Sequence, residues 1–468
     1  MRGRELKLLA GLLVMMSMLA TNRASAAAIA VTNYKADEEI RYPVPLIRGT
    51  IDDPQATEII VTNTSSTRDT HEMKGMAFKG QFKVMAELLP GENKLLLRSG
   101  KNEIPLTIRF KPQTTPYFVR AVYLTDKSGE TAFESPLEND PQDYAGKLDT
   151  ALKLMQTFTA ERMNDLGFGR TTFNLELDAN GKVIVHLHKG QMAAIDYYIL
   201  KDLAWYDKIY RELDRPFPMK FAKNFAVAAY SRFDPATGKT KAHTALGGGG
   251  LGLFGSGNLY TWPTKLTDAQ TAFMNAQRID KTRTQDDSAF RNTFWGAAST
   301  TIGASLHETG HTFGLPHSKE PQDIMTRGFD HFNRAFTFID PPSNNSKTPV
   351  EFKDDRIGCF APISAASLVT SRWFYPDKKE WREGTKITIG KDKDTGDIVI
   401  EGDAEIRYVS WSVKGDAVDY RVPPAGSRKF VIPAAEIQKK AGKEVYRIRV
   451  VDAEGNSKGK ESGELTAP

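Results

Sequence analysis

The sequence predicts a multidomain protein in which a central domain of the α+β class lies between two β-sandwich domains. Short β-type runs separated by turn residues occupy residues 30–113, and similar runs return after residue 385. Between them lies a long helical pattern over residues 143–166. A chain of 468 residues is longer than the length that usually folds around a single hydrophobic core, so two or three domains are expected.

Residues 1–26 have the pattern of a secretory signal peptide. Three basic residues, Arg2, Arg4 and Lys7, precede the apolar stretch 8–20, and residues 24–26 (ASA) are small enough for cleavage. The apolar stretch is shorter than the roughly 20 residues that a membrane span needs, so a retained anchor is the weaker alternative. We therefore expect a secreted or periplasmic protein with no membrane span after signal cleavage.

Charge and cysteine content exclude several classes of function. The formal net charge is +5, and it falls to +2 when residues 1–26, with four basic residues and one acidic residue, are removed. A balance this close to neutral gives no support for a nucleic-acid partner. The single cysteine, Cys359, excludes an internal disulfide and a cysteine-based metal site.

The flanking regions, residues 27–113 and 377–468, both have the run lengths and turn residues of β-sandwiches. The first contains TEIIVTN, QFKVMAEL and IPLTIRF, and the second contains KITIG, DIVIEG and VYRIRVVD. The stretches GTIDDP and LLPGENKLLL resemble the Ig-like accessory domains of secreted bacterial enzymes. We expect residues 27–113 to be a permanent accessory domain, with a removable prodomain as the alternative. The sequence does not indicate what either sandwich binds.

The central region, residues 114–376, mixes helices and strands. Within the predicted helix 143–166, Leu148, Leu152 and Met155 recur about one turn apart. The stretch TFNLELDANGKVIVHLHKG predicts a hairpin that turns at its Asn-Gly pair. A second helix is predicted over residues 194–213, and the strand FAVAAYS follows it.

The run HETGHTFGLPH at residues 307–317 is the strongest chemical signal in the chain. If residues 299–313 form a helix, His307 and His311 lie one turn apart on one face, where two imidazoles can bind one cation. Glu308 is rotated by about 100° from the first histidine, so it can reach a water at the metal without being a ligand. We therefore predict Glu308 to be the catalytic general base.

The helix must end before a third histidine can reach the same cation. Gly314 can adopt the left-handed conformation that ends helices, and Pro316 discourages their continuation. The chain can then turn and bring His317 back to the metal. Three neutral imidazoles leave one position open on a four-coordinate zinc, as catalytic sites require. We expect Zn2+ as the cofactor, with His307, His311 and His317 as its ligands.

The pattern HExxHxxGxxH resembles the zinc signature of metzincin metallopeptidases, in which a methionine turn follows the ligands. Met325 stands eight residues after His317, and HSKEPQDIM is similar to the HSxDPxxxM of matrix-metalloproteinase-like members. The continuation DIMTRGFDHFNRAF most resembles a sparsely characterised family of zinc metallopeptidases with fungal members. The resemblance implies a metzincin-like catalytic domain in which Met325 lies beneath the ligands as an apolar floor.

The resemblance is incomplete at the residue that helps zinc to stabilise the transition state. Astacin-like members carry a tyrosine two residues after the turn methionine, where this chain has Arg327. Arg327, His331 and Tyr260 are candidates for this role, each against the alternative of a solvated or structural side chain.

Upstream, GGGGLGLFGSGNLYTWP stands where metzincin-like folds have the edge strand of the cleft, with a surface loop as the alternative.

Together these features predict a secreted zinc-dependent endopeptidase that acts on a protein or peptide substrate. The predicted domains are the signal peptide (1–26), a sandwich (27–113), the catalytic domain (114–376) and a second sandwich (377–468). Two alternatives stay open. One is a zinc hydrolase of a non-protein amide in cell walls or glycan linkages, and the other is an adhesive β-domain protein with an inactive site.

Overall fold

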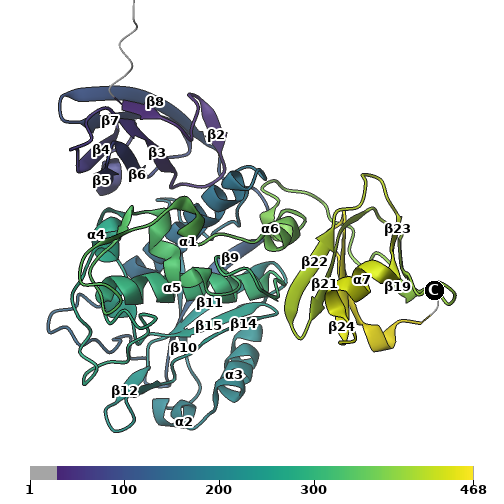
Figure 1. Ribbon diagram of the computed structural model, residues 1–468. Coiled ribbons are helices and arrows are strands. Elements are labelled where there is room, and N and C mark those ends of the chain that lie inside the picture. The colour runs from purple at the N-terminus through teal and green to yellow at the C-terminus, as the bar shows by residue number, and fades with distance from the viewer. Residues whose placement is uncertain (1–28, 467–468) are drawn as a thin grey trace, which may run out of the picture.

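The computed structural model describes residues 29–466, which form an N-terminal, a central and a C-terminal body (Figure 1). The predicted signal peptide lies outside the described residues. Within residues 29–466, no helix has the length and apolar character needed to cross a membrane. The zinc motif belongs to the central body, and both other bodies contact that body.

The N-terminal body is one continuous sheet of eight strands in the order β1-β3-β6-β5-β4-β7-β8-β2. All neighbours pair antiparallel except β2 and β8, which are parallel. Alternating residues of these strands are buried, as the burial patterns of β5 and β7 show. The strands are β1 (Ile29–Val31), β2 (Glu38–Ile40), β3 (Leu46–Ile51), β4 (Glu58–Asn63), β5 (Glu72–Phe78), β6 (Gln81–Met85), β7 (Gly91–Ser99) and β8 (Asn102–Phe110).

The central body has three layers built on a five-stranded sheet in the order β10-β9-β11-β15-β14. Four strands run parallel, and only the edge strand β14 is antiparallel to its neighbour. Helix α3 packs on one face, and α1 and α5 lie on the other (Figure 1). The sequence predicts mixed α and β structure here but does not indicate parallel pairing. The strands are β9 (Phe118–Thr125), β10 (Val185–Lys189), β11 (Ala222–Ala228), β14 (Ala245–Gly248) and β15 (Leu251–Gly255).

The helices of the central body agree with the sequence in part. Helix α1 occupies Tyr144–Asp165, as predicted, and the Asp143 carboxylate accepts a hydrogen bond from the Gly146 N–H at 2.8 Å at its start. The predicted helix 194–213 is instead two helices that fold back on one another, as the hydrogen bond from the Tyr197 hydroxyl to Glu212 at 3.0 Å shows. A straight helix would separate these residues by about 22 Å. The helices are α2 (Ala194–Tyr198), α3 (Asp202–Asp214), α4 (Ala269–Phe273), α5 (Phe294–Thr312) and α6 (Pro362–Val369), with short strand pairs β12 (Arg232–Asp234) with β13 (Lys239–Lys241) and β17 (Ile339–Asp340) with β18 (Val350–Glu351).

The C-terminal body consists of two sheets that share a separate hydrophobic core. Ile389 and Ile400 of the three-stranded sheet pack in one cluster with Trp411 and Ile448 of the other sheet. The first strand begins at residue 387, ten residues after the predicted domain start. The elements are β19 (Ile387–Lys391), β20 (Ile398–Gly402), β21 (Ile406–Val413), β22 (Asp416–Arg421), β23 (Lys429–Ile432), α7 (Ala434–Ala441), β24 (Tyr446–Asp452) and β25 (Ser457–Glu461).

The N-terminal sheet is joined to the central body through one continuous core and through buried polar contacts. Lys153 of α1 is fully buried, and its Nζ lies 2.9 Å from Oε1 of Glu87, which follows β6. The Thr157 hydroxyl donates to the Val44 carbonyl at 2.6 Å. Such contacts favour an integral N-terminal domain over a removable prodomain, because removal would leave Lys153 with less of its counter-charge in the core.

Glu87→Gln is expected to lower the free energy of unfolding by about 2–3 kcal/mol, because Lys153 keeps only its contact with Asp149. Burial raises the pKa of Glu87, but Lys153 and the Thr70 hydroxyl outweigh it and hold that pKa below 4.5. The ionised carboxylate therefore stabilises the fold above about pH 4.5, and this contribution disappears as the pH falls through the lowered pKa. Urea unfolding from pH 3 to 7 measures both effects.

The matched control is Glu58→Gln in the same sheet. Glu58 forms an exposed pair with Lys74 at 3.1 Å, so its loss should change stability by less than about 1 kcal/mol. Equal stability of the two variants would contradict the buried pair between the bodies.

Candidate metal centre

Helix α5 carries the first two histidines through the central body (Figure 1). The Thr293 hydroxyl accepts a hydrogen bond from the Gly296 N–H at 3.3 Å, so the helix begins at Phe294, earlier than the predicted residue 299. Gly303 lets the chain after the ligands approach closely, since a Cβ there would lie 2.1 Å from the Phe329 carbonyl oxygen. The helix is therefore fixed against the segment that follows the zinc motif.

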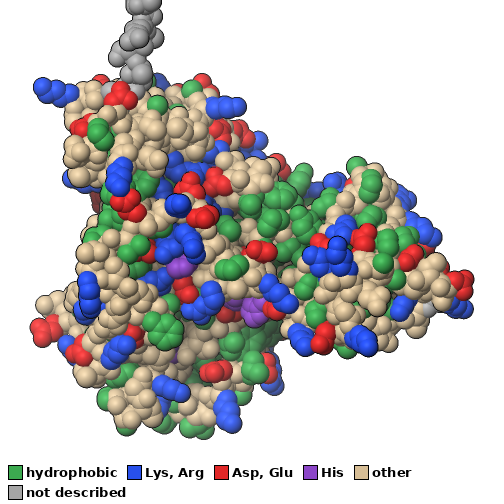
Figure 2. Space-filling view, viewed as in Figure 1, with side chains coloured by type: hydrophobic (Ala, Val, Ile, Leu, Met, Phe, Trp, Pro, Cys, Tyr) green, Lys and Arg blue, Asp and Glu red, His purple; other side chains and the backbone are tan. Residues whose placement is uncertain are grey.

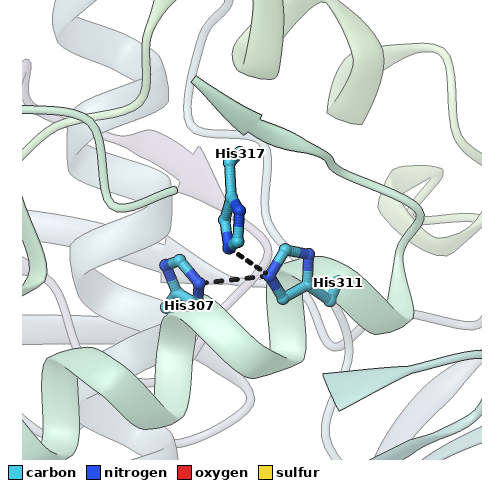
Figure 3. Close-up of side chains that lie close together, drawn as sticks. All are labelled: His307, His311 and His317. Carbon is cyan, nitrogen blue, oxygen red and sulfur yellow. Dashed lines mark hydrogen bonds between the residues drawn. The ribbon is translucent and has the colours of Figure 1, made fainter. Parts of the chain in front are cut away.

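The imidazoles of His307, His311 and His317 point toward one another (Figure 3). Nε2 of His311 lies 3.1 Å from Nε2 of His307 and 3.1 Å from Nε2 of His317. The ligand atoms of the three residues all lie within 4.8 Å of one another, and they are the one such group found among residues 29–466. The structure thus brings together the three residues that the sequence predicts as ligands.

Backbone carbonyls determine which nitrogen of each helix histidine carries the proton. Nδ1 of His307 lies 2.7 Å from the Ile324 carbonyl oxygen, and Nδ1 of His311 lies 2.7 Å from the Leu315 carbonyl oxygen. Because a carbonyl only accepts, each Nδ1 donates and each Nε2 presents a lone pair. Burial lowers the pKa of His307 to about 3 and also lowers the pKa of His311, so both rings are neutral near pH 7.

This donor set fits zinc. Lone pairs that face one another at 3.1 Å repel unless a cation lies between them. Zn–N bonds of about 2.0–2.1 Å in a tetrahedral arrangement place the ligand nitrogens about 3.3 Å apart, close to the spacing found here. Three imidazoles also leave a fourth tetrahedral position for water or substrate.

The turn after α5 returns the third histidine to the site. Gly314 is in the left-handed region with φ 84°, and the Leu315 N–H donates to the Gly310 carbonyl at 3.1 Å. His317 then begins β16 (His317–Ser318), which pairs in parallel with β22 of the C-terminal body. The backbone of the third ligand is therefore held by a domain outside the zinc motif.

Met325 is fully buried against the helix that carries the ligands. A Cβ on Gly310 would lie 2.6 Å from Sδ of Met325, so the thioether packs against α5 between the turns of His307 and His311. The preceding residue, Ile324, supplies the carbonyl that orients the first histidine. Met325 and Ile324 thus lie against the part of α5 that carries His307 and His311.

Glu308 lies beside the histidines with only 13% of its side chain exposed, and its Oε1 is 4.0 Å from Nε2 of His307. Burial raises the pKa of Glu308 to about 8, and the nearby backbone N–H of Gly247 acts in the opposite direction. A dication nearby favours the ionised form, so Glu308 is able to accept a proton when zinc is bound.

The glycine-rich stretch forms the edge of the central sheet beside Glu308. Strand β14 pairs only with β15, and Gly247 packs so tightly on α5 that a Cβ would lie 2.1 Å from the Glu308 carbonyl oxygen. The Tyr206 hydroxyl of α3 donates to the Gly248 carbonyl at 2.8 Å and supports the hairpin from the other face. Of the two interpretations that the sequence left open for this stretch, an edge strand and a surface loop, the structure shows an edge strand. The close approach of Gly247 to the backbone of Glu308 has no signal in the sequence beyond the glycines themselves.

The structure separates the three candidates for transition-state stabilisation. The guanidinium of Arg327 lies 4.7 Å from the centroid of the Phe329 ring, and that ring lies 5.3 Å from the imidazole of His307, so Arg327 is close to the site. His331 instead accepts a hydrogen bond from Arg291 at 3.0 Å, and Tyr260 is buried in a separate small cluster. Arg327 alone remains a candidate, although it also pairs with Asp330 at 2.8 Å.

Comparison with known proteins agrees with this geometry. The profile of a family described as "Putative peptidase family" matches residues 28–382. The chain belongs to this family. The match covers the N-terminal sheet and the central body and ends before β19. Its extent supports the view that the first two bodies form one structural unit.

Two fungal proteins described as putative zinc metalloproteinases are relatives. The one from Schizosaccharomyces pombe is 30% identical over 286 residues, which are 55% of this chain and 45% of that protein. The one from Saccharomyces cerevisiae is 26% identical over 296 residues, which are 54% of this chain and 42% of that protein. The match thus spans less than half the length of either relative. The description of both relatives as zinc metalloproteinases, together with the histidine cluster, confirms the predicted Zn2+ cofactor.

Among solved structures, the chain is similar to OgpA from Akkermansia muciniphila, in a catalytically inactive form with an O-glycopeptide substrate. The TM-score is 0.47 at 17% identity, over 75% of this chain and 93% of that chain. The wild-type form of the same protein has a TM-score of 0.45 at 17% identity, over 75% of this chain and 92% of that chain.

Gly247→Ala is expected to push β14 away from α5. The new Cβ would meet a backbone oxygen, which cannot be relieved by a side-chain rotation, so we expect a loss of about 1–3 kcal/mol in the free energy of unfolding. The matched control is Gly248→Ala on the same strand, where the nearest atom is the Tyr206 hydroxyl at 3.7 Å. Urea unfolding distinguishes them, and indistinguishable midpoints would show that β14 does not pack on α5 as described.

Proposed function

We propose that this chain is a zinc-dependent endopeptidase of the metzincin type, with Glu308 as its general base. One observation carries the proposal: three imidazole nitrogens lie within 4.8 Å of one another, and a buried carboxylate lies 4.0 Å from one of them. Three nitrogen ligands with an adjacent glutamate are the composition of zinc peptidase sites. Membership of a peptidase family supports the same function.

The residues of the chain have separate roles in hydrolysis. Zinc held by the three nitrogens supplies Lewis acidity, which polarises a carbonyl and lowers the pKa of water. Glu308 accepts the proton of the attacking water and later passes it to the leaving amine. Gly247 packs against the backbone of Glu308, and the carbonyls of Ile324 and Leu315 keep two ligand rings in position.

Strand β14 supplies the surface for an extended peptide. Its outer edge has no ladder partner among the described residues, so a substrate backbone can add as one more strand. Next to it, a cavity of about 260 Å³ is lined by Ala245 of β14, Ala304 and Ser305 of α5, and the indole of Trp262. A substrate side chain can enter this largely apolar space one helical turn from Glu308. Binding along an edge does not require a chain end, which favours endopeptidase action.

Export is part of the proposal and rests on the sequence pattern of residues 1–26. Protein recovered from the periplasm or the culture medium should begin at residue 27, as N-terminal sequencing would show. An N-terminus at Met1 in the recovered protein would contradict export by signal cleavage. The Ig-like character of the flanking domains likewise stays a proposal that rests on sequence resemblance.

Glu308→Gln is expected to keep about one zinc per chain, because it alters no ligand, and to lower proteolysis by about 10²–10⁴-fold, because an amide cannot accept the proton. Zinc is measured by atomic emission, and cleavage is measured on casein and on a proteome-derived peptide library. The matched control is Glu320→Gln, since Glu320 is an exposed glutamate on the same loop as His317 and should retain both properties.

Two results would contradict the peptidase proposal. One is a zinc-loaded wild type that cuts no protein or peptide while it cleaves peptidoglycan amides, which would favour the non-protein alternative. The other is a Glu308→Gln variant as active as the wild type, which would remove the carboxylate from the mechanism.

A further inference from the structure

A second cavity, of about 410 Å³, lies where the central body meets the C-terminal body. The end of α5 and the start of β11 form one side, and β24 with the segment after α6 forms the other. Gly314, the turn residue between the zinc ligands His311 and His317, is part of its wall. The proposed hydrolysis uses none of the side chains in this cavity.

The cavity contains four cationic side chains and no acidic one: Lys220, Lys223, Arg372 and Arg449. Arg372 has one carboxylate near it, that of the exposed Glu383 at 3.7 Å. In the described part of the chain, the other three have no carboxylate oxygen within 4.0 Å of a side-chain nitrogen. On the face shown in Figure 2 basic and acidic side chains intermingle, so an acid-free group of four cations differs from that face.

Two of these cations, Lys223 and Arg449, are penalised by burial and have no carboxylate partner among the described residues. Burial lowers the pKa of Lys223 to about 8 and no other cause contributes, while its Nζ donates to the Gly249 carbonyl at 2.7 Å and lies 4.5 Å above the Trp373 ring. Burial likewise lowers the pKa of Arg449, whose Nη1 donates to the Ser367 hydroxyl at 2.7 Å. Unpaired charge in such surroundings is costly, so a counter-ion would stabilise it.

Capping of α5 does not account for Arg449. The carbonyls of Gly310 and His311 near the helix end already accept backbone hydrogen bonds, Gly310 from Leu315 at 3.1 Å and His311 from Gly314 at 2.9 Å, and no hydrogen bond from Arg449 to the helix is found among the described residues. The guanidinium lies beside Gly314 but its one hydrogen bond goes to Ser367. Its remaining N–H groups are therefore available to a ligand.

We propose that this cavity binds a tetrahedral oxyanion, phosphate or sulfate, either free or as the ester of a larger molecule. The cations come from three separate segments (β11, the segment after α6, and β24), an arrangement that suits an anion with oxygens in several directions more than a flat carboxylate. The volume of about 410 Å³ corresponds to more than ten waters at roughly 30 Å³ each, which leaves room for an ester group. The bound anion joins the C-terminal body to the turn that leads to His317.

The test is isothermal titration calorimetry of the full-length zinc-loaded protein with sodium sulfate, sodium phosphate and glucose 6-phosphate at constant ionic strength. Sodium chloride is the reference salt. We expect saturable binding of one anion per chain. Tighter binding of glucose 6-phosphate than of phosphate identifies an ester as the ligand, and the reverse order identifies the free ion.

Point variants locate the binding. Arg449→Gln and Lys223→Met should each weaken binding by about tenfold or more, because each removes a charge-assisted hydrogen bond to the anion. The matched control is Arg447→Gln, which removes an exposed arginine from the same face of the same strand and should bind as the wild type does.

The outcomes separate the proposal from its rivals. An anion bound at the zinc centre instead would bind to Arg449→Gln and to the wild type equally, and that result overturns the proposal. Absence of saturable binding to the wild type also overturns it. Arg449→Gln could melt at a lower temperature in the absence of anion, and its binding result would then not be interpretable. In that case Lys223→Met decides whether the anion binds in this cavity, because this variant keeps an aliphatic side chain beside Trp373. Peptidase activity enters none of these measurements.

Discussion

The structure depends on bringing the Nε2 atoms of three imidazoles to one point. Such a cluster is unfavourable by itself, because lone pairs at 3.1 Å repel. Carbonyl acceptors at Nδ1 and burial maintain it for His307 and His311, and the exposed His317 is held through the pairing of its strand with β22. The helix also has to end after Thr312 so that His317 can return, which Gly314 permits through its positive φ. Helix length, turn geometry and the packing of Met325 all follow from this one requirement.

Both flanking bodies contribute to that arrangement. From the N-terminal sheet, Tyr42 donates to the buried Glu161 of α1 at 2.7 Å, and α1 packs in the same core as α5. From the C-terminal body, β22 pairs with the strand that contains His317. The ligands are therefore supported from opposite ends of the chain, which explains why the zinc motif alone describes only part of the centre.

Much of the site was predictable because its residues are close in sequence. The i, i+4 spacing of His307 and His311 and the breaker at Gly314 specify local geometry, and the structure places them as expected. The helix over α1 was predictable for the same reason, from apolar residues one turn apart. The break between α2 and α3 was not, because it depends on the contact of Tyr197 with Glu212. Gly247 also gave no sign that it approaches Glu308, which lies on another element.

The sequence by itself determined the zinc ligands, the neighbouring carboxylate and the turn between them, because helical periodicity and glycine conformation act over a few residues. Only the tertiary structure decided the parallel sheet, the edge position of β14, the buried pair of Lys153 with Glu87 and the pairing of His317 with Asp416. These features join residues that are far apart in the chain. Their stability depends on burial and charge pairing between distant segments, which a local sequence pattern does not show.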